Sequence, residues 1–176
     1  MAKWRNSDCK EDLPWDDSYK GESVAELLAK RGKIRSDSLV LAFELAADSI
    51  PEEEINFHER VILAVEAMEM QVNNGGYGQF FVNSSSAYTD VIHEALLAIE
   101  CEACAAITAD AIAALNLPPG YDGDMVSEIA DDLSAKQQEE LAACDDRYFA
   151  NDEWIAAQLL DFIERNQDKI RIPWPR

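Results

Sequence analysis

A run of two asparagines and two glycines at residues 73–76 constrains the fold more than any other feature of this sequence. Asn and Gly tolerate the left-handed backbone conformation that ends a helix. Apolar residues recur at helical spacing before this run, over 57–72, and again after it, over 90–115. We therefore predict a helical corner, in which the buried aromatic pair Phe80 and Phe81 forms an apolar plug among the flanking helices.

The rest of the chain also carries helical patterns, and no alternating strand pattern or repeat is evident. Further helices are expected over residues 22–31, 37–47, 125–133 and 134–149, and from 151 onwards. The sequence therefore predicts an all-α fold, a single-domain bundle of roughly seven or eight helices.

Capping residues mark several of the expected helix starts. Asn56 with Glu59, and Ser134 with Gln137, have the spacing of capping boxes. Asn151 is expected to cap the last helix. Three glutamates of the helix before the corner are expected to point mostly towards water: Glu59, Glu66 and Glu69.

Composition shifts along the chain predict three regions. Residues 1–50 form an N-terminal arm and accessory helices, 51–166 a core helical domain that carries the corner, and 167–176 a proline-rich tail. Within the arm, Trp4 and Trp15 lie among charges, and these aromatics either dock on the domain or belong to a flexible tail. The first residues lack the apolar segment of a signal peptide, and no apolar run has the length of a membrane span. We therefore expect a cytoplasmic protein with reduced cysteines.

The charge is strongly negative and unevenly distributed. The chain has 35 acidic and 15 basic residues, a formal net charge of −20. Residues 61–135 contain no Lys or Arg, but they contain 12 carboxylates. Carboxylates three or four positions apart on a helix repel each other, and surface helices ordinarily interleave Glu with Lys. Such a chain should repel nucleic acid and anionic membranes and attract basic proteins, and solubility or life in high salt is the alternative explanation of the charge.

Signals for catalysis are weak. The chain has two histidines, His58 and His93, whereas a metal site needs three or four converging ligands. Cys101 and Cys104 lie in an Ala-rich helical segment, where buried thiols are the more ordinary interpretation. Paired acids could serve acid–base chemistry or bind Mg²⁺, but such pairs arise by chance in a chain this acidic. The sequence therefore predicts no catalytic residues, no metal and no cofactor.

The corner also carries a family resemblance. Its residues follow the pattern E-x-x-VNNGG-aromatic-x-QFF-x-N-S through Glu69, Val72, Asn73, Asn74, Gly75, Gly76, Tyr77, Gln79, Phe80, Phe81, Asn83 and Ser84. This segment resembles the signature of a family of small, acidic, all-helical bacterial proteins long labelled a domain of unknown function. The family's best-known member is a DNA-mimic protein that binds a transcription regulator. The resemblance extends from about residue 57 to about 166 and also implies a possible homodimer, for which the Ala-rich segment 103–115 is a candidate contact face.

The resemblance and the charge together favour a DNA mimic. Carboxylates one helical turn apart are separated by about 5–6 Å, which is comparable to the phosphate spacing on one strand. The charge pattern nominates ten partner-binding acids: Glu66, Glu69, Asp90, Glu94, Glu100, Glu102, Asp110, Glu128, Asp131 and Asp132. The expected partner is a basic DNA-binding protein, not nucleic acid or a membrane. The alternatives are an immunity or antitoxin-like protein that neutralises a basic toxin, and a small carboxylate- or metal-dependent enzyme.

Overall fold

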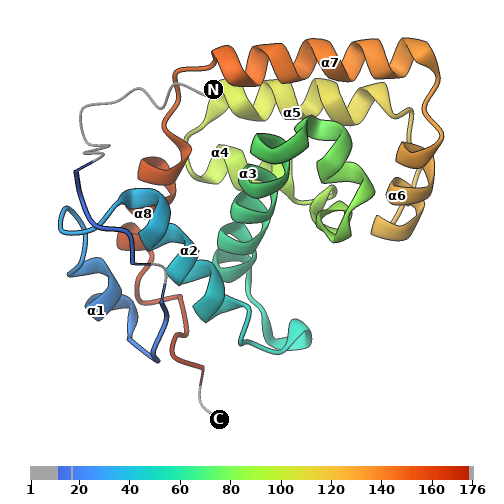
Figure 1. The fold of residues 1–176 in the computed structure, drawn as a ribbon. Coiled ribbons are helices and arrows are strands. Elements are labelled where there is room, and N and C mark those ends of the chain that lie inside the picture. Colours follow the sequence, from blue (N-terminus) through green and yellow to red (C-terminus); the bar gives the residue numbers. More distant parts are fainter. Residues whose placement is uncertain (1–11, 17, 175–176) are drawn as a thin grey trace. The chain divides into compact units, whose positions relative to one another are not determined.

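The computed structural model describes residues 12–16 and 18–174, and within these ranges its regular elements are helices (Figure 1). The helices are α1 (Val24–Leu28), α2 (Ser36–Ala47), η1 (Glu52–Glu54), α3 (Phe57–Val82), η2 (Ser84–Tyr88), α4 (Ile92–Ala98), α5 (Glu102–Ala114), α6 (Gly123–Asp131), α7 (Ala135–Ala150) and α8 (Ile155–Arg165). The elements labelled η are short 3₁₀ helices. The prediction of an all-α fold with seven or eight helices is confirmed.

Contacts divide the chain into two compact units. The terminal unit comprises Met1–Glu66 and Trp154–Arg176, and the central unit comprises Ala67–Glu153. The division falls within α3, whose first part belongs to the terminal unit and whose second part belongs to the central unit. The predicted domain limits at residues 50 and 166 stay predictions.

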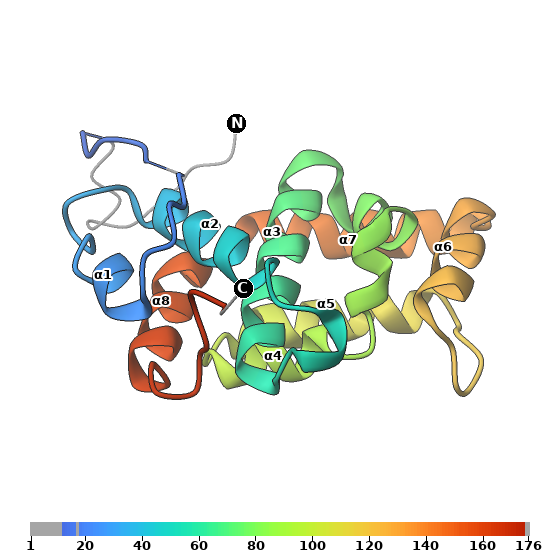
Figure 2. The same ribbon diagram turned by 90° about the horizontal axis from the view of Figure 1, so that it is seen from below.

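The terminal unit packs α2 against both α1 and α8, and α2 and α8 lie side by side in Figure 2. Its core is made of side chains that are fully buried, among them Leu27, Leu39, Phe43, Leu159 and Ile163. These residues occupy the apolar faces that the helical spacing of the sequence predicts.

The N-terminal arm falls only partly within the described residues. Trp4 lies outside them. Trp15 is exposed, and the Arg35 guanidinium lies over its ring at 5.4 Å from the centroid. The Asp16 N–H donates to the Ser38 hydroxyl at 2.7 Å, which ties this part of the arm to α2. In the part of the chain that the structure describes, no helix has the length and apolar character needed to cross a membrane.

The first part of α3 is buried on nearly every side, since residues 61–66 are all inaccessible to solvent or almost so. The expectation that Glu59 and Glu66 point towards water is therefore wrong. A helix surrounded by other elements has no solvated face on which to place its polar residues. Glu59 is 0% exposed, and its carboxylate accepts hydrogen bonds from the Arg171 side chain (2.7 Å) and backbone N–H (2.9 Å).

The central unit is built from α3 to α7. Helix α5 packs against α4 and α7, and α5 and α7 run side by side in Figure 1. In the Ala-rich segment that was considered for a homodimer contact, Ala105, Ala111 and Ala114 of α5 are buried, whereas Ala103, Ala106 and Ala113 are exposed. The homodimer contact stays a prediction. Helix α6 packs against η2.

The predicted helix boundaries hold at most positions. Both capping boxes form, with Asn56 and Glu59 bonded reciprocally at the start of α3 and Ser134 with Gln137 at the start of α7. The prediction that Asn151 caps the last helix is wrong, because Asn151 follows the last residue of α7, and α8 begins only at Ile155. Its side chain accepts instead from the Glu153 N–H at 3.3 Å, within the connecting segment.

Candidate functional site

The predicted corner lies within α3, at Gly75 and Gly76. Gly75 has φ −159° and ψ 22°, and Gly76 has φ 77° and ψ −176°. The positive φ of Gly76 is available to glycine at little cost and strains other residues. The backbone therefore turns here and resumes as a helix, so Gln79 to Val82 is helical. Phe80 and Phe81 are fully buried with ring centroids 5.2 Å apart, which confirms the buried aromatic pair.

Asp145 of α7 closes the corner. Its carboxylate accepts the Tyr77 N–H at 2.7 Å, as a capping residue does at the start of a helix. A Cβ on Gly76 would collide with this carboxylate, so the second glycine also makes room for the cap. Burial raises the pKa of Asp145, an effect that the hydrogen bond from Tyr77 partly offsets. Sequence reasoning missed this role, because Asp145 lies 68 residues away and resembles the other acids around it.

The amide side chains at the corner are also held by hydrogen bonds. Gln71 accepts from the side chains of Gln79 (2.8 Å) and Asn83 (2.6 Å), and thereby joins the two halves of α3 across the turn. Asn73 donates to the Glu69 carbonyl at 2.7 Å. Asn73 and Asn74 are both exposed. These contacts give much of the VNNGG–QFF segment a structural role, in holding the corner together.

A buried polar contact links the corner to α5. The Tyr77 hydroxyl lies 2.8 Å from the Thr108 hydroxyl, and both residues are 0% exposed. Thr108 also lies 3.7 Å from the Met68 sulfur. Burial raises the pKa of Tyr77 well above its ordinary value, so the phenol stays protonated. The pair therefore satisfies two hydroxyl groups inside the core of the central unit.

Two of the ten nominated acids are not displayed on the surface. Glu66 is buried on α3. Glu69 is partly buried and accepts a hydrogen bond from the Tyr148 hydroxyl. Burial raises its pKa from 4.5 to about 8, so Glu69 is largely uncharged at neutral pH. Neither side chain fits the nominated role of a surface anion, because both lie on the inner helix α3.

The other eight nominated acids are exposed. They are Asp90, Glu94, Glu100, Glu102, Asp110, Glu128, Asp131 and Asp132, on or beside α4, α5 and α6. Asp110 accepts from Arg147 at 2.6 Å, so one member of the set is neutralised by a base of its own unit. The whole central unit holds 17 acidic and two basic residues, a net charge of −15. The second base, Lys136, lies 3.3 Å from Glu140.

The residues considered for metal binding do not converge. His93 is exposed, whereas Cys101 and Cys104 are buried. Burial raises the pKa of Cys101 to about 12 and that of Cys104 further still. The Glu153 carboxylate accepts the backbone N–H groups of Ala103 (2.8 Å) and Cys104 (2.7 Å) at the start of α5. Among the residues that the structure describes, no three His, Cys, Asp or Glu side chains are grouped to hold a metal ion.

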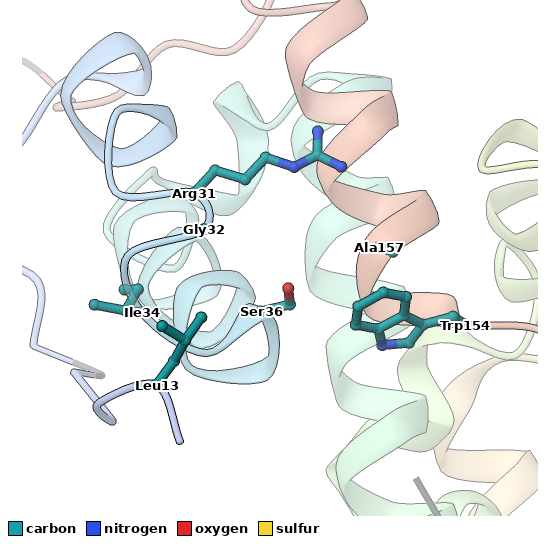
Figure 3. A pocket seen from close by; sticks show the side chains of 7 residues that line it. All are labelled: Leu13, Arg31, Gly32, Ile34, Ser36, Trp154 and Ala157. Atoms are coloured by element: carbon teal, nitrogen blue, oxygen red, sulfur yellow. The ribbon is translucent and has the colours of Figure 1, made fainter. Parts of the chain in front are cut away.

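A small pocket lies in the terminal unit, between the turn that precedes α2 and the start of α8 (Figure 3). Trp154 and Ser36 line it, together with Arg31. The Arg31 guanidinium is held by Asp161 (2.5 Å) and Glu164 (2.8 Å), so its charge is already matched within the chain. The pocket therefore supplies no uncompensated charge from Arg31 for a ligand, and the exposed acids of the central unit are the stronger candidate site.

The fold and the charge define an all-helical protein with a strongly acidic central unit. The chain belongs to the family of DMP19-like proteins, whose model matches residues 53–166. That range is nearly the one over which the sequence resemblance was expected. Neither the curated proteins nor the solved structures include a match to this chain.

Proposed function

We propose that this protein is a DNA mimic, which uses exposed carboxylates of the central unit to occupy the DNA-binding surface of a basic protein. Membership of the DMP19-like family supports this, since the resemblance described above connects the family with DNA mimicry. The observation that carries the proposal is the charge of the central unit, −15 over residues 67–153 with two bases. A basic protein whose surface accommodates phosphates would meet carboxylates in their place.

The pairing of charges supports the same proposal. Arg147 and Lys136 each contact an acid of the central unit, which leaves most of its exposed carboxylates without a nearby base of that unit. Exposed like charges contribute nothing to fold stability and reduce it where they are adjacent. A binding role explains why they are kept, because electrostatic complementarity accelerates association and selects the partner.

Capture followed by competition tests the proposal. Immobilised protein is exposed to a lysate of the source organism at low ionic strength, retained proteins are eluted with salt, and each DNA-binding protein recovered is purified. We expect the protein to release labelled duplex DNA from at least one of them, with an affinity that falls steeply with salt. DNA mimicry would be contradicted if the retained proteins keep their DNA in the presence of this protein. It would also be contradicted if the retained protein is a toxic enzyme whose activity is abolished instead.

A matched pair of charge variants sharpens this test. Glu94, Glu102 and Glu128 of the central unit are changed to Gln in one protein. Asp48→Asn, Glu53→Gln and Asp168→Asn, all exposed positions of the terminal unit, are combined in the control. Both variants lose the same charge, yet we expect about tenfold weaker competition from the first and little change from the second. Equal effects would show that net charge, and not the central unit, governs binding.

A further inference from the structure

Helix α6 presents a row of carboxylates along one side. Asp124, Glu128 and Asp131 follow each other at one-turn spacing, and Asp132 comes directly after the helix end. All four side chains are exposed. At 3.6 residues per turn, the four positions fall within roughly one third of the helix circumference. Asp124 was absent from the nominated acids, and the helical register is what adds it to the row.

An apolar edge accompanies this row. Met125 is 37% exposed and occupies the position beside Asp124 and Glu128 on the helix surface. Val82, at the end of α3, is also exposed, and its carbonyl accepts the Ser127 hydroxyl of α6 at 2.7 Å. The solvent-facing side of α6 therefore combines anionic groups with the partly exposed side chain of Met125.

The opposite side of α6 anchors the helix in the central unit. Val126 and Ala130 are buried there. The Asp122 side chain caps the first turn by accepting the Met125 N–H at 2.9 Å. A Cβ on Gly123 would lie 2.8 Å from the Ala87 Cα, so the backbone of α6 approaches η2 closely. The helix is thus fixed in orientation, and the acidic row is held on a defined face.

The arrangement opposes the intrinsic stability of the helix. Carboxylates at Asp124, Glu128 and Asp131 repel each other at i,i+4 and i,i+3 spacing. Asp131 and Asp132 lie at the C-terminal end, where the helix dipole disfavours negative charge. Residues 61–135 contain no Lys or Arg that could relieve this. The usual interleaving of acidic and basic residues on a surface helix is thus absent from α6, although the helix is well anchored. Such a departure from local stability points to a function for the exposed face.

We propose that this face of α6 is the docking surface for a cationic amphipathic helix of a partner protein, one with Lys or Arg side chains around a single apolar anchor. The carboxylate row pairs with the basic groups, and the anchor packs on Met125. This inference rests on the proposed function and assigns its principal contact. A partner of this chemistry is favoured over a second copy of the chain, because two acidic rows would repel each other.

The test uses the full-length protein and a short, fluorescently labelled helical peptide rich in Lys and Arg, with one Leu on its basic face. A variant combining Glu128→Gln, Asp131→Asn and Asp132→Asn is compared with a control combining Glu139→Gln, Asp146→Asn and Asp152→Asn, which removes equal charge from exposed positions elsewhere in the central unit. Fluorescence anisotropy at low ionic strength should show about tenfold weaker binding for the α6 variant and a clearly smaller loss for the control.

Two further measurements complete the design. Replacing the Leu of the peptide by Ser, or Met125 by Ser, should weaken binding, and the two changes together should weaken it no more than either alone. The α6 variant should also melt at a higher temperature than the unmodified protein, because repulsion is removed. Equal losses for the two charge variants would overturn the docking surface and leave DNA mimicry standing. Absence of both peptide binding and DNA competition would overturn the proposed function itself.

Discussion

The terminal and central units treat a buried carboxyl group in opposite ways, although both groups belong to α3. In the terminal unit, burial favours protonation of Glu59, but hydrogen bonds from Arg171 and from the Asn56 N–H outweigh it and lower the pKa. In the central unit, Glu69 meets the neutral hydroxyl of Tyr148, and burial raises its pKa to about 8. The terminal unit therefore keeps Glu59 ionised and pairs it with Arg171, whereas the central unit favours the protonated, uncharged form of Glu69.

The same contrast extends to the surfaces. The terminal unit has 18 acidic and 13 basic residues, a net charge of −5, and its described bases form several ion pairs, such as those of Lys30, Arg31 and Arg60. The central unit, at −15, has two bases. Positive charge is therefore used for internal pairing in one unit, while the other displays most of its acids to solvent. The comparison teaches that most of the net negative charge of this chain, −15 of −20, belongs to one unit, which overall composition alone does not reveal.

The largest effect is expected from Gly76→Ala, which attacks the corner of the central unit. The left-handed φ strains alanine, and its Cβ displaces Asp145 from the Tyr77 N–H. The free energy of unfolding should fall by about 2–4 kcal/mol in denaturant titrations. Gly78→Ala is the matched control: it lies in helical backbone with open space around it and should raise stability by about 0.5–1 kcal/mol.

Hydrogen exchange on the Gly76→Ala protein then tests the division into units. Amides of α5 and α7 should lose protection, while those of α2 and α8 keep more of theirs. A uniform loss of amide protection throughout the chain would show that the two units unfold together. The units would then differ in their charge but not in their stability.

The next effect concerns the paired carboxylate of the terminal unit. Glu59→Gln removes the charge but keeps an acceptor for the Asn56 N–H. Because Glu59 is fully buried and Arg171 is partly exposed, we expect a loss of about 1–2 kcal/mol at neutral pH. The loss should shrink when the pH falls through the lowered pKa of Glu59, since the unmodified protein then also loses its charge there. A loss that is independent of pH would contradict the pairing.

The unpaired carboxyl group of the central unit should produce the opposite pH dependence. The pKa of Glu69 is raised to about 8 in the folded protein, from 4.5. Its contribution to stability is therefore complete below about pH 4.5 and is lost as the pH rises towards 8. Glu69→Gln should flatten this decline, as measured by unfolding between pH 5 and pH 9, approximately the interval over which the group titrates. If Glu69→Gln leaves the dependence of the unfolding free energy on pH unchanged, Glu69 is ionised in the folded protein at neutral pH, which would contradict its raised pKa.

The smallest effect is expected at the exposed ion pairs. Arg31→Gln breaks contacts with Asp161 and Glu164 and should lower the free energy of unfolding by about 0.5–1 kcal/mol. Arg147→Gln, at the single contact with Asp110, should have a smaller effect and should make the central unit more acidic. Thermal melts of the two variants measure the two effects, and added salt should reduce both, because it screens both pairs. A larger loss from Arg147→Gln would reverse the assignment of structural pairing to the terminal unit.

Local patterns predicted most of the helices. The Asn–Gly run, both capping boxes and the apolar spacing each act over a few residues, so they can be read from neighbouring positions. Asn151 was assigned to the wrong helix because its residue type fits a cap wherever a helix is expected to begin. The inward orientation of Glu59 and Glu66 could not be predicted, because it depends on how many elements surround α3.

The candidate site was predictable in part. Eight of the ten nominated acids are exposed, because charged residues on amphipathic helices usually face water. The cap that Asp145 provides for Tyr77, the contact of Tyr148 with Glu69 and the neutralisation of Asp110 by Arg147 join residues far apart in sequence. Nothing in the spacing of these residues marks such pairs, and only the fold brings them together.

The Glu153 carboxylate at the start of α5 has a chemical consequence for the two cysteines beside it. Cys101 and Cys104 have the Cys-x-x-Cys spacing at a helix start, where free backbone N–H groups and the helix dipole would stabilise a thiolate and make it reactive. Glu153 occupies two of those N–H groups and adds a negative charge. Burial, and to a lesser extent the Glu153 charge, raises the pKa of both thiols, which opposes the thiol–disulfide chemistry that this motif otherwise supports. Alkylating reagents and mild oxidants should leave both sulfurs unmodified for as long as the central unit stays folded.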